Sequence, residues 1–213
     1  MISAFHKFIL VLACVNVFSS GYAQQGRLKK FFGLSSPERR WVYAHPFITI
    51  TTLKLSEHAA DITRGQEESP DLDGYGNGGQ VDAFRHCFWM ASLCQEIKEK
   101  KALKLGVAHE KGNEKDFKKR QYEEGVLPDM IANTMDLCNN QIGAVLSREN
   151  PGVNEETLIF LVKAAITSGR CKIIKSDSNG DFLDADGKII KYEDWHGKWV
   201  NARCLVSSDH KVN

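Results

Sequence analysis

The sequence predicts a mainly α-helical protein of the α+β class, a single multi-helix domain with a C-terminal β-hairpin element. Between about residues 36 and 169, apolar residues recur at the spacing of amphipathic helices. Between about residues 171 and 206, apolar and polar residues alternate around two hairpin-turn signals, Asn179-Gly180 and Asp186-Gly187. The length of 213 residues and the hydrophobic content of 42% suit one globular domain.

The first 23 residues have the three-part layout of a secretory signal peptide. Lys7 precedes an apolar run from Phe8 to about Phe18, and small or turn-forming residues follow up to Ala23. The run is shorter than the roughly 20 apolar residues of a transmembrane helix. We therefore expect cleavage after Ala23 and no transmembrane span in the mature form.

The sequence divides into a signal peptide over residues 1–23, a linker over 24–35 and one globular domain over 36–213. We expect the protein to be secreted or periplasmic. A lipoprotein anchored at Cys14 is the less favoured alternative, because it leaves a very short apolar run before the cysteine.

Start and stop signals place the helices. Ser36, Pro37 and Glu38 predict a helix with Ser36 as N-cap, and Pro46 should interrupt it. A loop rich in glycine, proline and acidic residues then leads into a well-marked helix. The later helices are expected at about residues 81–99, 101–112, 129–146 and 154–168.

The charge balance gives no reason to expect a nucleic-acid partner. Formal net charge is +1, and removal of the signal peptide takes away Lys7, so the mature protein is close to neutral. An anionic membrane surface is disfavoured on the same ground. We expect the partner to be an unidentified substrate or a component of the cell envelope.

Export would allow the cysteines to pair. Cys171 and Cys204 bracket the expected hairpin, so we predict a disulfide between them. The remaining cysteines of the mature chain lie in helical patterns and lack the short spacing of a zinc site, which indicates buried apolar filler.

Three polar side chains interrupt an apolar helix. Asp82, Arg85 and His86 lie in the stretch GQVDAFRHCFWMASLCQ, whose remaining residues leave little surface for water. A buried charge costs several kcal/mol unless it is paired. These groups must therefore meet partners on other elements or line a wet cavity.

Two later helices offer comparable polar groups. His109, with Glu110 beside it, follows small residues at helical spacing, which indicates a close approach to another helix. Ala132, Asp136, Asn139 or Asn140, and Gly143 form a stripe of small and polar residues opposite the apolar face of a further helix. We expect these groups to meet in one sheltered site.

The motifs DAFRHCFW, LGVAHEKGN and MDLCNNQIG, preceded by RRWVYAHPF, occur in this order. The chain from about Ser36 to Val206 thereby resembles a bacterial family of secreted and toxin-associated domains whose function is unassigned. The resemblance supports fold and compartment more than reaction.

The polar set favours a hydrolase. His86 or His109 would be the base, Asp136 or Glu110 would orient it, and Arg85 would stabilise negative charge. The candidate catalytic residues are Asp82, Arg85, His86, His109, Glu110, Asp136, Asn139 and Asn140.

Two alternatives remain open at this point. In one, a divalent metal ion lies between His86, His109, Glu110 and Asp136 and activates water. In the other, the protein is a non-enzymatic binding or scaffold domain of the envelope whose polar motifs form a buried structural network. A toxin-like effector domain is a third, less favoured hypothesis.

Overall fold

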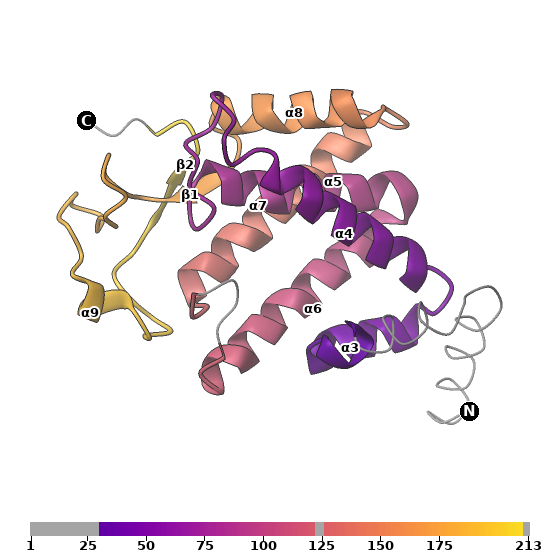
Figure 1. Cartoon of the computed structure of the whole chain (residues 1–213), viewed down its shortest axis with the longest axis horizontal. Coiled ribbons are helices and arrows are strands. Elements are labelled where there is room, and N and C mark those ends of the chain that lie inside the picture. The colour runs from indigo at the N-terminus through magenta and orange to yellow at the C-terminus, as the bar shows by residue number, and fades with distance from the viewer. Residues whose placement is uncertain (1–29, 122–125, 211–213) are drawn as a thin grey trace.

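The computed structural model describes residues 30–121 and 126–210. The expected signal peptide and most of the expected linker lie outside these ranges. The described chain is mostly helical, with a two-stranded antiparallel sheet near its C-terminal end (Figure 1). Its elements are α3 (Ser36–Ala44), α4 (Thr49–Arg64), α5 (Gln80–Glu96), α6 (Glu99–Lys118), α7 (Met130–Glu149), α8 (Glu155–Thr167), β1 (Lys172–Ile174), α9 (Tyr192–Trp195) and β2 (Leu205–Ser207).

Helix α3 begins one residue earlier than its sequence signals indicate. Ser35, not Ser36, is the N-cap of α3, and it forms a capping box with Glu38. The backbone N–H of Ser35 donates to Oε2 of Glu38 over 2.7 Å. The helix ends at Ala44, two residues before Pro46, which confirms the predicted interruption.

The predicted helices are all present, with shifted ends. The helix expected at 101–112 continues to Lys118, so α6 takes in the charged segment that follows it. Asp129 caps α7 by accepting a hydrogen bond from the backbone N–H of Ala132 over 3.0 Å. Asn154 caps α8 as predicted, and Gly169 follows the helix with a φ of 79°.

Helix α5 is the centre of the domain. It contacts α4, α6, α7 and α8, and α7 covers more of it than any other element does. Phe84 and Phe88 stack within the core shared with α8, and Met90 and Leu93 belong to a second core cluster shared with α3 and α6. The apolar density of α5 is thus explained by neighbours on nearly every side.

Glycine permits the close approach of α7 to α5. A Cβ at position 143 would come within 2.2 Å of the carbonyl oxygen of Cys87. On α6, a Cβ at Gly106 would lie 2.9 Å from the side-chain nitrogen of Asn140. Gly143 and Gly106 therefore lie at contacts between helices, as the helical spacing of the small residues around them predicts.

The C-terminal segment forms one short ladder and two tight turns. β1 pairs with β2 in antiparallel register, with Lys172 opposite Ser207 and Ile174 opposite Leu205. Between them, isolated bridges enclose both predicted turns, where Gly180 and Gly187 have φ values of 86° and 85°. The β-hairpin element is confirmed, and α9 lies in the long connection at the left of Figure 1.

The predicted disulfide between Cys171 and Cys204 is wrong. Both are free thiols in the structure. The register explains why: the Ser208 N–H donates to the carbonyl of Cys171, while the Lys175 N–H donates to that of Cys204. The two cysteines thus lie at opposite ends of the ladder, farther apart than a disulfide spans. Cys171 instead contacts the thiol of Cys87, which, together with burial, raises the pKa of Cys87 well above its usual value.

A buried ion pair fastens this segment to the helices. The guanidinium of Arg203 pairs with Oδ2 of Asp129, the N-cap of α7, and both side chains are almost fully buried. Arg203 also lies over the rings of Phe182 and Trp195, 4.5 and 4.6 Å from their centroids. The start of α7 is therefore held by a residue 74 positions later.

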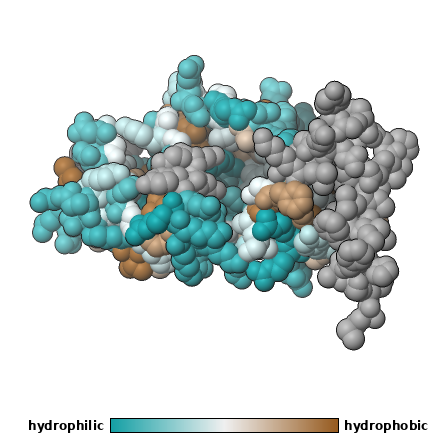
Figure 2. All heavy atoms as spheres, turned by 60° about the horizontal axis from the view of Figure 1, so that its bottom comes forward, coloured by the Kyte–Doolittle hydropathy of each residue, from teal (hydrophilic) through white to brown (hydrophobic). Residues whose placement is uncertain are grey.

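The surface shown in Figure 2 is mostly hydrophilic, with hydrophobic residues in small separate groups. Among the described residues, we find no helix with both the length and the apolar character needed to cross a membrane.

Candidate functional site

Helix α5 presents three polar groups along one face. Oδ1 of Asp82 lies 2.7 Å from Nη2 of Arg85, and Nη2 lies 3.2 Å from Nε2 of His86. Oδ2 of Asp82 accepts a hydrogen bond from the backbone N–H of Gly78 over 2.7 Å. The spacings of three and four residues place all three side chains on adjacent turns of one face. Asp82 and His86 are buried, whereas Arg85 reaches toward solvent with 29% of its side chain exposed.

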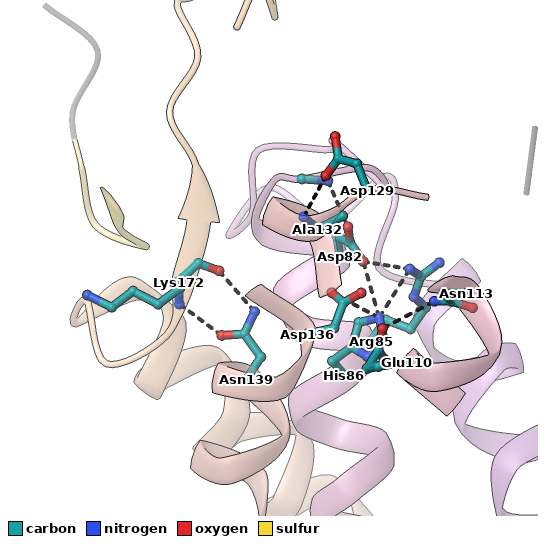
Figure 3. A network of polar contacts seen from close by, with 11 residues as sticks. Asp82, Arg85, His86, Glu110, Asn113, Asp129, Ala132, Asp136, Asn139 and Lys172 are labelled. Atoms are coloured by element: carbon teal, nitrogen blue, oxygen red, sulfur yellow. Dashed lines mark hydrogen bonds and ion pairs between the residues drawn. The ribbon is translucent and has the colours of Figure 1, made fainter. Parts of the chain in front are cut away.

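Helix α7 adds Asp136 to this group (Figure 3). Its Oδ1 lies 3.3 Å from Nε2 of His86, and the same nitrogen lies 3.6 Å from Oδ1 of Asp82. One imidazole nitrogen therefore faces two carboxylates, which come from different helices. The close packing of α7 on α5 at Gly143 sets this separation.

Helix α6 brings His109 and Glu110 to the same place. The ring centroids of His109 and His86 are 6.5 Å apart, and that of His109 lies 5.8 Å from that of Trp89. Glu110 is buried, and its Oε2 accepts a hydrogen bond from Nδ2 of Asn113 over 3.2 Å. The predicted convergence of three helices is thus present in the geometry.

A carboxylate from α3, which the sequence did not single out for the site, also joins it. Oε1 of Glu38 lies 3.1 Å from Nδ1 of His109. Glu38 was recognised only as a first-turn acid, and a capping residue carries no signal for a contact 71 residues away. His109 is thereby oriented by a side chain whose other oxygen caps its own helix.

Asn139 is not part of this cluster. Its side-chain amide donates to the carbonyl of Lys172 over 2.9 Å and accepts from the N–H of Lys172 over 2.8 Å. Figure 3 shows this pair on the side of α7 away from His86. Asn139 therefore attaches β1 to α7, a structural task.

Asn140 lies one helical turn from Asp136 and is buried against Gly106. Neither atom of its amide has a hydrogen-bond partner among the described residues. An unsatisfied buried amide costs about 1 to 3 kcal/mol, so its position calls for a bound water or ligand group nearby.

Burial shifts the titration of the two central groups in opposite directions. Desolvation, reinforced by the charges of Arg85 and His109, holds the pKa of His86 well below its usual 6.5, so the ring is neutral at neutral pH. Desolvation, reinforced by Asp82 and Glu110, raises the pKa of Asp136 well above 3.8. Both shifts favour the uncharged form of the side chain concerned.

The geometry also selects a set of candidate metal ligands. Asp82, His86 and Asp136 each place one ligand atom within 4.8 Å of the others, and all three are buried. This set differs from the one the sequence suggested, because it includes Asp82 and leaves out His109 and Glu110.

The chain belongs to DUF6973, a family defined by a domain of unknown function, whose model matches residues 39–170. The match covers α4 to α8 and most of α3, and so includes Asp82, Arg85, His86, His109, Glu110 and Asp136. No curated protein and no solved structure matches the chain.

Proposed function

We propose that this protein is a hydrolase of the cell exterior or periplasm, with its active site where α5, α6 and α7 meet. One observation carries the proposal: titratable side chains from three helices lie in contact range of one another, at a place that reaches solvent through Arg85 and His109. Burying several such groups together is costly for the fold. Such a cost is typical of a functional site.

His109 is the general base of this proposal. It is only partly buried, and Glu38 holds its Nδ1 at 3.1 Å, as a carboxylate orients the base of a catalytic triad. Arg85 supplies the positive charge that stabilises negative charge developing on the substrate. Burial and the neighbouring carboxylates raise the pKa of Asp136, which favours the protonated form of this side chain.

The experiment compares His109→Gln with His58→Gln. The control histidine is exposed and pairs with Glu155 on the surface, so its replacement changes a similar histidine–carboxylate pair that is not one of the site contacts. Each variant is assayed against lipid, peptide, glycan and phosphoester substrates after circular dichroism shows that it is folded. We expect the His109 variant to lose turnover by about 100-fold or more, as loss of a general base does, and the His58 variant to keep it.

The alternative, a scaffold domain with a structural polar network, makes the opposite prediction. His86→Ala and Asp136→Ala would then lower the melting temperature, and no substrate of the panel would be turned over by any form of the protein. Equal turnover by the wild type and a folded His109→Gln variant would contradict the proposed role of His109 as the general base.

A further inference from the structure

We propose that Asp82, His86 and Asp136 form a binding site for one divalent transition-metal ion. Metal binding at this site does not depend on the proposed hydrolase function, whereas a catalytic role for the ion rests on it. Three features support the site: the spacing of the ligand atoms, the local charge and one buried oxygen.

The spacing of the ligand atoms suits coordination. Nε2 of His86 lies 3.6 Å from Oδ1 of Asp82 and 3.3 Å from Oδ1 of Asp136. Ligands bonded at about 2.0 to 2.2 Å in tetrahedral directions lie about 3.3 to 3.6 Å from one another. Two of the three separations thus match those that an ion requires, and the third is no longer than 4.8 Å.

The charge of the cluster favours a cation. Asp82 and Asp136 are buried close together, and Glu110 adds a third buried carboxylate. Arg85 faces this group, with His109 near its edge. Carboxylates buried close together repel one another, and a divalent ion bound between them would offset that repulsion.

A buried oxygen provides an independent indication of a ligand. Oδ1 of Asp136 faces Nε2 of His86, yet it accepts no hydrogen bond from any described residue. Native proteins satisfy most buried oxygens of this kind. Coordination to a metal ion would satisfy it.

Replacement of Arg85 should change the affinity for the metal ion in the direction opposite to replacement of a ligand. Its Nη2 lies within 2.7 Å of Asp82 and 3.2 Å of His86, so the guanidinium competes with a metal ion for the same two ligands. Because the side chain reaches solvent, it can turn outward when an ion enters. Replacement of Arg85 by glutamine should therefore strengthen metal binding.

The ligand types select the class of ion. One neutral imidazole with two carboxylates suits ions such as Zn²⁺ and Mn²⁺ better than Mg²⁺ or Ca²⁺, which prefer all-oxygen sites. Mn²⁺ is the cleaner probe, because the free thiols of the chain attract Zn²⁺.

The test is titration calorimetry with MnCl₂ on chelator-stripped protein, supported by thermal unfolding with and without the ion. We expect one ion per chain and a raised melting temperature. The isosteric variant Asp136→Asn and the variant His86→Gln should weaken binding by more than about 100-fold, beyond the usual loss from an outer-shell change. Arg85→Gln should bind more tightly than the wild type.

Asp181→Asn, at an exposed position in the connection between β1 and β2, is the matched control and should bind as the wild type does. Absence of stoichiometric binding, or binding that survives both ligand substitutions, would overturn the proposal. Metal binding without turnover would refute only the hydrolase, and turnover that chelation leaves unchanged, without ion binding, would refute only the metal site.

Discussion

Gly143 of α7 faces the backbone of Cys87 on α5 so closely that a Cβ would lie 2.2 Å from its carbonyl oxygen. Real side chains do not approach a backbone oxygen so closely, so any larger residue must push the helices apart. The separation of His86 and Asp136 depends on this contact, because each lies on one of the two helices.

Replacement of Gly143 by alanine should lower the free energy of unfolding by about 1 to 3 kcal/mol, as overpacking does. Urea denaturation followed by circular dichroism measures it. Gly76→Ala is the control, since a Cβ there meets nothing within 4 Å, and it should change stability by less than about 1 kcal/mol. Equal effects of the two substitutions would contradict the role assigned to the contact.

Arg203→Leu should be strongly destabilising, by about 3 to 5 kcal/mol, because it leaves Asp129 buried without its cation. The exposed pair of Arg148 and Glu99 offers a matched control. Arg148→Leu should cost less than about 1 kcal/mol. A similar loss of unfolding free energy in both variants would show that burial of the Arg203 pair does not matter.

Asn139→Asp should release β1 from α7. The carboxylate would retain the acceptor for the Lys172 N–H but would face the Lys172 carbonyl without a donor, at a cost of about 1 to 3 kcal/mol. Hydrogen exchange at the amide of Lys172 should accelerate, while amides in the middle of α8 serve as an internal reference. Unchanged protection of Lys172 would show that the amide pair does not hold the strand.

The stability that Glu38 contributes should be lost in acid, when its carboxylate becomes protonated. Burial raises its pKa, but the hydrogen bond and charge of His109, together with the Ser35 cap, outweigh burial and hold the pKa below 4.5. A carboxyl group with a lowered pKa in the folded state contributes stability above its unfolded pKa and loses it as pH falls through the folded pKa.

The difference in unfolding free energy between the wild type and Glu38→Gln should therefore be largest near neutral pH and shrink below about pH 4.5. Glu114→Gln is the control. Its pKa is lowered by Lys118 on an exposed helix face, so salt should screen its effect more strongly. A pH-independent difference for Glu38 would refute the linkage.

The sequence was informative where a pattern repeats. Asp82, Arg85 and His86 stand out because they interrupt an apolar helix, and burial without partners is expensive. The helices carrying His109, Glu110 and Asp136 were recognisable from periodicity, and their convergence is confirmed as geometry. Their chemical roles remain predictions.

Asn139 and Asn140 show the limit of helical periodicity as a guide to the role of a side chain. Asn139 and Asn140 differ by one position, about 100° around the helix, and only Asn140 lies on the face toward α6. A stripe of asparagines cannot reveal which member binds a backbone on another element.

Contacts between distant segments could not be predicted from the sequence, for a different reason. Glu38 meets His109, and Asp129 meets Arg203, through packing that no local spacing encodes. The expected disulfide was wrong because each cysteine immediately precedes its strand, and antiparallel pairing places the starts of the two strands at opposite ends of the ladder.

The family match stops at residue 170, yet the positive charge held by Asp129 belongs to residue 203. A fragment trimmed to the recognisable region would present a lone carboxylate at the start of the helix that carries Asp136. Exchange of C-terminal segments between relatives would succeed only where the incoming piece supplies a replacement cation. The segment that must be kept together for this ion pair to form is therefore longer than the segment that the family model matches.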